Sequence, residues 1–257
     1  MKRLHIVGSP RSGTTLMMEL FVTCFQSNGF CEHEMSIFDE PELKAGLFFS
    51  KQPTDVKYIE RVFKSDPNLF VVYILRDPRS VISSIHASKP HEYFCNYRIW
   101  KECNDAAQRI MDCPRFLSVR YEDLVQIPNK VQRQIVERFS FLKKKCNFSG
   151  FEKLSNPSKQ SLNALSGLRP ICADRVNAWQ KHLPRIKSEL DKNPHLLKDL
   201  TENGYEKDNS WAIVLEGIEP TRYNCRYPDS RPILKTIETR FRKWMKSRQY
   251  IASRNLR

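Results

Sequence analysis

Apolar residues follow two patterns along the chain: short runs, and longer stretches in which they recur with helical spacing. Short apolar runs rich in β-branched or aromatic residues predict buried parallel strands, and they lie at residues 4–7, 70–75 and 116–119. Helical spacing predicts helices at residues 14–25, 56–63, 93–111 and 131–142, and a mostly helical stretch at 175–204 that is interrupted at Pro184 and Pro194. This order predicts an α/β fold, a P-loop-like parallel β-sheet flanked by helices on both faces.

The pattern weakens near the C-terminus and then returns in a different form. After Trp211 no clear periodicity is visible until Ile233, Ile237, Phe241 and Met245, which recur every four residues among Lys and Arg. A length of 257 residues suits one α/β domain with a modest appendage. We therefore expect an α/β domain over residues 1–210 and a basic appendage with an amphipathic helix over 211–257.

Composition excludes several classes of protein. Hydrophobic residues make up 40% and charged residues 28% of the chain, which is ordinary for a globular protein and unlike a largely disordered one. No run of about 18 apolar residues exists that would span a bilayer, and the apolar run after the first Met is too short for a secretory signal. These features favour a soluble, cytoplasmic protein.

The eight cysteines carry no metal-binding signature. None of them is spaced as C-x-x-C, and none forms a Cys/His cluster with zinc-finger spacing. We expect most of them to be small buried hydrophobes of a reducing compartment, although their even number leaves a disulfide or two open.

The net charge of +14 is concentrated at the C-terminal end, where residues 221–257 hold eleven Lys or Arg against two acidic residues. Two interpretations of this tail remain open. The helix docks on the body of the protein and leaves a basic face in solvent, or it contacts an anionic acceptor or membrane surface.

The first chemical motif is Gly-Ser-Pro-Arg-Ser-Gly-Thr-Thr at residues 8–15, between a predicted strand and a predicted helix. Backbone amides of such a loop and the N-terminus of the following helix form a cradle for an anion. The spacing G-x-x-x-x-G is that of a P-loop, but Thr14-Thr15 stand where a nucleotidase has Lys-Ser/Thr. The missing Lys argues against hydrolysis of a nucleoside triphosphate, and the cation lies inside the loop instead, as Arg11.

The second motif is Arg76-Asp77-Pro78-Arg79, followed by Ser84. Arg76 ends a predicted central strand, at the sheet edge where α/β proteins bind ligands. Its planar guanidinium suits a phosphate because it donates two parallel charge-assisted hydrogen bonds. Asp77-Pro78 predicts the start of a helix, and Ser84 is expected about two turns into it.

Both motifs resemble the phosphate-binding motifs of sulfotransferases that use 3′-phosphoadenosine 5′-phosphosulfate (PAPS). The Arg in the first loop is closest to the tyrosylprotein and carbohydrate type. The resemblance implies PAPS as donor, 3′-phosphoadenosine 5′-phosphate (PAP) as product and no metal. It also implies in-line transfer of a sulfuryl group to a hydroxyl of a sugar, a peptide tyrosine or a small metabolite. The implied donor-binding residues are Pro10, Arg11, Ser12, Gly13, Thr14, Thr15, Arg76, Ser84, Tyr121, Ser158 and Arg169.

The resemblance also implies catalytic residues. Arg11 and Lys51 match cations that neutralise charge on the leaving group, and residues 31–34 lie where tyrosylprotein enzymes have Cys-Gly-Glu-Glu. Glu34 then aligns with their base. The chain departs from that pattern by His33 and by a two-residue insertion after the first helix, so Glu32 or His33 as base, or no local base, stays open.

Two rival functions remain. A nucleotide kinase with a degenerate P-loop would need the missing Lys. A non-enzymatic nucleotide- or nucleic-acid-binding adaptor would need exposed aromatic residues among basic ones for base stacking. Phe241 and Trp244 fit an amphipathic helix at least as well, so we expect no nucleic-acid partner.

Overall fold

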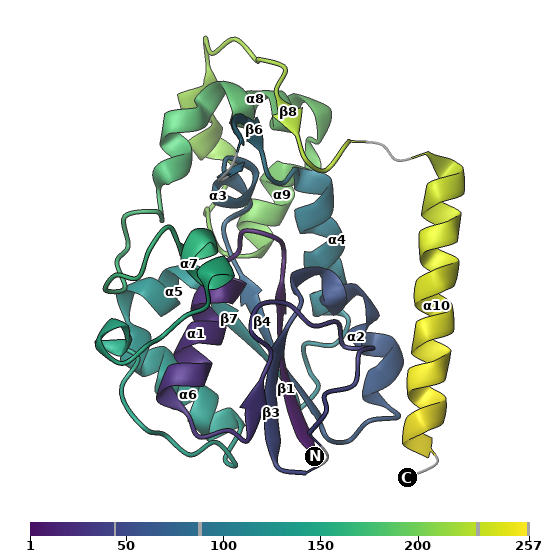
Figure 1. The fold of residues 1–257 in the computed structure, drawn as a ribbon. Helices are drawn as coiled ribbons and strands as arrows, with labels where there is room; N and C mark the ends of the chain where they lie inside the picture. Colours follow the sequence, from purple (N-terminus) through teal and green to yellow (C-terminus); the bar gives the residue numbers. More distant parts are fainter. Residues whose placement is uncertain (44, 87–88, 230–231, 256–257) are drawn as a thin grey trace.

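The fold is built around a five-stranded parallel sheet (Figure 1). The computed structural model describes residues 1–43, 45–86, 89–229 and 232–255. The strand order is β2-β3-β1-β4-β7, with all pairs parallel. The strands are β1 (Lys2–Gly8), β2 (Gly29–Phe30), β3 (Leu47–Lys51), β4 (Leu69–Leu75) and β7 (Phe116–Arg120).

Helices cover both faces of this sheet, as the apolar runs predict. Successive side chains of a strand point to opposite faces, and in β4 Val71 and Tyr73 enter one hydrophobic core whereas Val72 and Ile74 enter the other. The first core includes residues from α2 (Val56–Phe63) and α4 (Tyr97–Gln108). The second includes residues from α1 (Thr14–Cys24), α5 (Tyr121–Gln126) and α6 (Pro128–Arg138).

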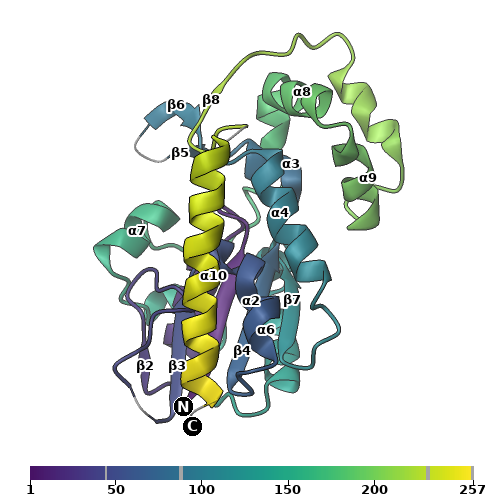
Figure 2. The ribbon, with the colours of Figure 1, turned by 90° about the vertical axis from the view of Figure 1, so that its right-hand side faces the viewer.

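A helical layer and a small sheet lie beyond the carboxyl ends of the main strands (Figures 1 and 2). The small sheet has the order β5 (Ile85–His86), β6 (Lys89–Tyr93), β8 (Asn224–Cys225). The helices of this region are α3 (Pro78–Ile82), α7 (Lys159–Leu165), α8 (Leu183–Lys192) and α9 (His195–Glu202). Short 3₁₀ helices occupy Pro53–Asp55, Phe151–Lys153, Ala178–His182 and Asn209–Leu215.

Two local predictions are wrong. Tyr93 ends strand β6 rather than opening a helix, because Asn96 caps α4 by accepting a hydrogen bond from the Ile99 amide. Ser84 lies beyond the end of α3, which stops at Ile82, and not two turns inside a helix.

The C-terminal helix α10 (Ile233–Asn255) runs beside the sheet and packs against α2 (Figure 2). The predicted helix is therefore present, but its apolar stripe does not face the body. Ile237, Phe241 and Met245 are 58%, 62% and 40% exposed, and the side chain of Ile233 lies outside the described residues. None of the described helices is both long and apolar enough to cross a membrane.

All eight cysteines belong to the described part of the chain and are free thiols. Only half of them, Cys24, Cys31, Cys95 and Cys103, are buried, and the other four are partly exposed. The expectation that most are buried is therefore wrong. Of the partly exposed four, Cys113 and Cys146 still pack against the two hydrophobic cores, Cys172 lies in an irregular segment, and Cys225 lies in β8 of the small sheet.

Candidate functional site

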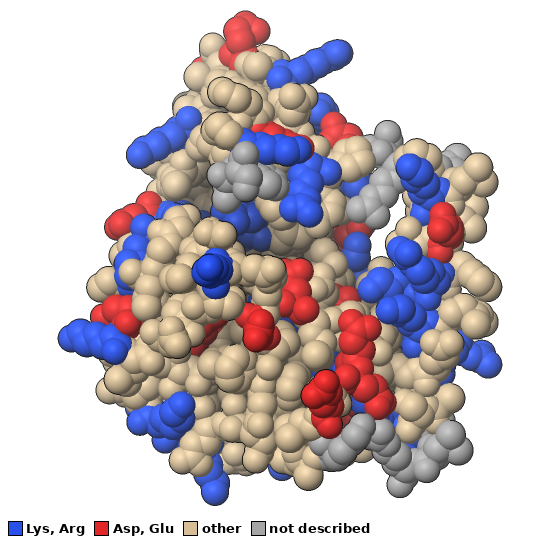
Figure 3. Space-filling view, viewed as in Figure 1, with Lys and Arg blue, Asp and Glu red and all other residues tan. Residues whose placement is uncertain are grey.

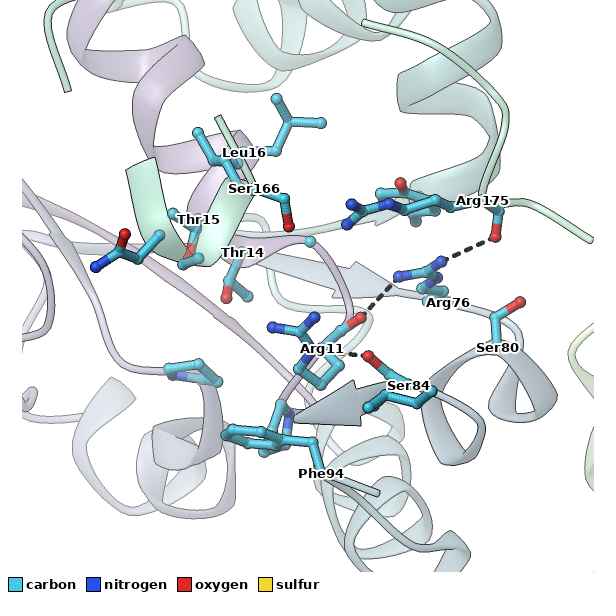
Figure 4. A pocket seen from close by; sticks show the side chains of 18 of the residues that line it. Arg11, Thr14, Thr15, Leu16, Arg76, Ser80, Ser84, Phe94, Ser166 and Arg175 are labelled. Atoms are coloured by element: carbon cyan, nitrogen blue, oxygen red, sulfur yellow. Dashed lines mark hydrogen bonds between the residues drawn. The ribbon is translucent and has the colours of Figure 1, made fainter. Parts of the chain in front are cut away.

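A cavity of about 960 Å³ opens at the carboxyl ends of the sheet strands (Figure 4). Its wall draws on the loop after β1, the end of β4, the start of α5 and the segment between α7 and α8. Among the described residues this wall carries five arginines but one carboxylate, that of Glu34. The arginines are Arg11, Arg76, Arg169, Arg175 and Arg226. Such a wall attracts an anion.

The loop between β1 and α1 is shaped by its two glycines. A Cβ on Gly8 would lie 2.9 Å from the Ile74 carbonyl oxygen and closer still to the Ser12 hydroxyl. Gly13 has a φ of +104°, and a Cβ there would lie 2.6 Å from the Tyr121 ring. The loop therefore folds tightly over the sheet edge and leads into α1 without a side-chain cap. The first amides of α1 have no helical carbonyl to bind and are available to an anion.

Arg76 connects this loop to a distant segment of the chain. Its guanidinium stacks 4.0 Å above the Tyr121 ring. Its Nη1 donates to the Arg11 carbonyl at 2.9 Å and its Nη2 to the Arg175 carbonyl at 3.0 Å (Figure 4). Its buried Nε has no partner among the described residues. Arg76 thus holds the cavity wall together and keeps one buried donor unsatisfied.

Arg11 points across the cavity toward the small sheet. Its Nε donates to the Ser84 hydroxyl at 2.7 Å, and its guanidinium lies 5.5 Å from the centre of the Phe94 ring. Burial lowers the pKa of Arg11, and the positive charges of Arg76 and Arg175 lower it further. These three guanidinium groups repel one another, and that repulsion would be relieved by a bound anion.

Sequence reasoning missed Arg175. It follows α7 in an irregular stretch and lies 99 residues from Arg76 along the chain. No motif and no periodicity marks it, so only the fold brings it beside the other two arginines. The nearby predicted residue Arg169 does line the cavity.

A second group of polar side chains lies at the end of β3. Lys51 is 1% exposed, and its Nζ donates to Thr15 Oγ1 at 3.1 Å and to Glu34 Oε1 at 3.3 Å. Burial lowers the pKa of Lys51, and the charge of Glu34 offsets part of that effect. Burial and the charge of Lys51 also lower the pKa of His33, which lines the cavity with Glu34.

The structure separates the predicted site residues into two sets. Pro10, Arg11, Gly13, Thr14, Thr15, Glu34, Arg76, Ser84, Tyr121 and Arg169 line the cavity. Lys51 reaches the cavity wall only through its two partners, and Ser12 is fully buried below the loop. Ser158 caps α7 and donates to the Glu32 carbonyl at 3.4 Å. Neither Ser158 nor Glu32 lines the cavity.

Arg79, which the second motif also contains, is a structural residue. It is 3% exposed, pairs with Asp77 and Glu206, and lies between the rings of Trp179 and Trp211. The described residues hold no group of three His, Cys, Asp or Glu arranged to bind a metal ion.

Residues 34–141 of the chain match the sequence model of a protein family that is described as "Sulfotransferase family". This segment contains Glu34, Lys51, Arg76, Ser84 and Tyr121. The chain resembles the sulfotransferase family over this segment, which is less than half of its length. The match does not include the loop of residues 8–15, which lies before it. The geometry of this loop is therefore an observation independent of the match.

The fold is similar to that of a solved sulfotransferase domain. The sulfotransferase domain from the curacin biosynthetic pathway aligns with a TM-score of 0.53 at 17% identity, over 70% of this chain and 90% of that domain. A mouse sulfotransferase complexed with PAP aligns with a TM-score of 0.43 at 14% identity, over 79% of this chain and 88% of the mouse chain. No curated protein sequence matches this chain significantly.

Proposed function

We propose that this protein transfers a sulfuryl group from PAPS to an acceptor hydroxyl. The observation that carries the proposal is the cluster of Arg11, Arg76 and Arg175 beside the N-terminus of α1, with no carboxylate bonded to any of the three among the described residues. A cluster of like charges with a helix N-terminus is suited to a ligand with more than one anionic group.

The residues of the cavity fit such a donor. The amides at the start of α1 and Arg11 would hold the 5′-phosphosulfate, whereas Arg76, Ser84 and Arg175 would hold the 3′-phosphate. The buried Arg76 Nε without a partner supports this assignment, because an unsatisfied buried donor is costly unless a ligand binds it. When bound, PAPS supplies an activated sulfuryl group with a nucleotide as leaving group.

The chain itself would supply charge neutralisation and a proton acceptor. Arg11 belongs to the loop that leads into α1, and the Lys51 Nζ donates to Thr15 in the first turn of α1. Cations at that point stabilise negative charge that grows on the leaving group. Glu34 and His33 face the same cavity, and each is a candidate to take the proton of the acceptor hydroxyl. The lowered pKa of His33 keeps its imidazole neutral at pH 7, the form that accepts a proton.

Thermal unfolding in the presence of PAP, AMP and ATP tests the donor assignment. A ligand at one hundred times its Kd stabilises the folded state by about 2.7 kcal/mol, which raises Tm by roughly 5–10 °C for a chain of this size. We expect this rise with PAP in a metal-free buffer, and a much smaller one with AMP, which lacks the 3′-phosphate.

Matched variants assign the effect to the cavity. Arg175→Gln should reduce the PAP-induced rise in Tm, whereas Arg133→Gln, an exposed arginine of α6, should leave it unchanged. Equal stabilisation by AMP and PAP would show that the cavity has no site for the 3′-phosphate. Stabilisation by ATP that requires magnesium and exceeds that by PAP would favour a nucleotide kinase instead.

A further inference from the structure

Helix α10 presents an apolar face to solvent. Its exposed apolar side chains form an outer stripe, which consists of Leu234, Ile237, Phe241, Trp244 and Met245, exposed by 82%, 58%, 62%, 42% and 40%. At 100° per residue these five positions lie within one side of the helix. Phe241 and Trp244 also stack on each other, with ring centroids 5.9 Å apart. This is a contiguous apolar surface rather than a set of scattered residues.

The opposite face of α10 anchors the helix to the body. Tyr250 is 4% exposed and donates a hydrogen bond to Asp66. Arg254 pairs with Asp66 at 3.1 Å, and Lys243 pairs with Asp55 at 3.7 Å. These polar contacts hold α10 on the body with the outer stripe toward solvent. The helix therefore exposes its apolar side chains without detaching from the body.

The charge of α10 divides between these two faces. The helix carries seven Lys or Arg and one Glu. Lys243, Lys246 and Arg254 pair with carboxylates of the body, where Figure 3 shows blue side chains of the helix opposite red ones. Lys235, Arg240 and Arg242 make no ion pair with described residues. The seventh, Arg248, lies over the Trp244 ring at 5.3 Å, within the angular range of the outer stripe and one turn beyond Trp244. On the helical wheel Lys235, Arg240 and Arg242 flank the outer stripe, Arg240 on one side and the other two on the other.

We propose that the outer stripe of α10 binds the surface of an anionic lipid bilayer. Apolar side chains, with an indole among them, would enter the boundary between headgroups and acyl chains. The flanking cations would contact the acidic headgroups. The proposal goes beyond transfer of the sulfuryl group and does not depend on the donor site.

Two other occupants fit the observations less well. A second copy of the chain would bring the unpaired cations of two α10 helices together, and like charges oppose such pairing. A nucleic acid would complement the flanking cations but leave the central apolar side chains without partners, since nucleic-acid binding to phosphates is electrostatic.

Trp244 provides a direct reporter of binding. The other three tryptophans, Trp100, Trp179 and Trp211, are at most 9% exposed. Vesicles of phosphatidylcholine with about 30 mol% phosphatidylserine should therefore shift the Trp244 emission to the blue and carry the full-length protein in flotation. Vesicles of phosphatidylcholine alone should bind at least about tenfold more weakly, since the cations would lack anionic partners.

Paired variants separate the apolar and the charge contribution. Ile237→Ser with Phe241→Ser should weaken binding to the anionic vesicles by at least about tenfold, and Arg240→Gln with Arg242→Gln by about thirtyfold at low salt. Leu154→Ser with Ile213→Ser removes two apolar side chains that are equally exposed, at 67% and 66%, but lie outside α10. This control should bind as the unaltered protein does.

Four results would overturn the proposal. The first is no flotation of the unaltered protein with anionic vesicles, and the second is unchanged binding by the Ile237/Phe241 variant. The third is a dimer in light scattering that this variant abolishes, which would assign the outer stripe to a second copy. The fourth is binding to single- or double-stranded DNA that prevents flotation and is lost with the same variant, which would assign the stripe to a nucleic acid.

Discussion

Replacing Arg76 by Ala tests both roles that the structure and the proposal give to this residue. In the structure, Arg76 donates to the carbonyls of Arg11 and Arg175 and stacks on Tyr121. In the proposal, the same guanidinium recognises the 3′-phosphate of the donor. The substitution should therefore lower stability without ligand and lower affinity for PAP more than for AMP.

The contacts of Arg76 set the size of both effects. A hydrogen bond to a charged group contributes about 1.5–3 kcal/mol, and a cation–π contact contributes about 0.5–2 kcal/mol. Repulsion from Arg11 and Arg175 offsets part of this sum, so we expect a net loss of about 3 kcal/mol, or roughly 6–12 °C in Tm. Loss of a charge-assisted contact with the phosphate should weaken PAP binding by at least about tenfold.

Calorimetry with PAP and AMP on the unaltered protein, Arg76→Ala and Arg76→Lys separates the two roles. The Lys variant keeps the charge but lacks the planar group whose two terminal nitrogens each reach one carbonyl, so it should recover part of the PAP affinity and little of the stability. An equal loss of affinity for both ligands would show that Arg76 only maintains the fold. An unchanged Tm would refute the bridging role derived from the structure.

Three further outcomes are expected. Arg11→Ala should reduce turnover by roughly 10²–10³-fold and PAP affinity far less, because the contact proposed for it with the transferring group is strongest in the transition state. Single-turnover kinetics with a PAP titration checks this. Glu34→Gln should keep PAP binding and flatten the rise of activity with pH, whereas full activity of this variant together with an inactive His33→Ala would make His33 the base. Burial lowers the pKa of His5 below its ordinary value of 6.5. As the pH falls below 6.5, the imidazole is therefore protonated in the unfolded chain before it is protonated in the folded chain. Stability present above that pH is then lost on acidification, and His5→Asn should flatten this part of the profile of urea midpoint against pH.

The sequence alone predicted three of the five strands of the sheet, β1, β4 and β7, the helices on its two faces and the two motifs that line the cavity. It did not predict β2 and β3. The predicted features are local, since a buried strand needs a run of apolar residues and a tight turn over a sheet edge needs glycine. Arg76 was also predictable as a residue of the site, because the carboxyl end of a central strand is a fixed place in such folds.

Only the tertiary structure decided which distant residues complete the site. Arg175 joins Arg11 and Arg76 because the segment after α7 crosses the sheet edge, and no local pattern encodes that path. The resemblance implied Lys51 as a catalytic cation, which stays a prediction, but its burial between Thr15 and Glu34 was not predicted. The spacing of residues along the chain does not tell which side chains from distant segments contact each other in the fold.

Helix α10 shows the same limit most clearly. Its periodicity predicted an amphipathic helix, and the helix is there, yet periodicity identifies an apolar stripe without saying what covers it. Its orientation is fixed by Tyr250, Lys243 and Arg254, whose partners Asp66 and Asp55 lie more than 180 residues earlier in the chain. Ion pairs and hydrogen bonds to buried carboxylates hold the polar face inward, because a buried carboxylate without a partner costs more than an exposed apolar side chain.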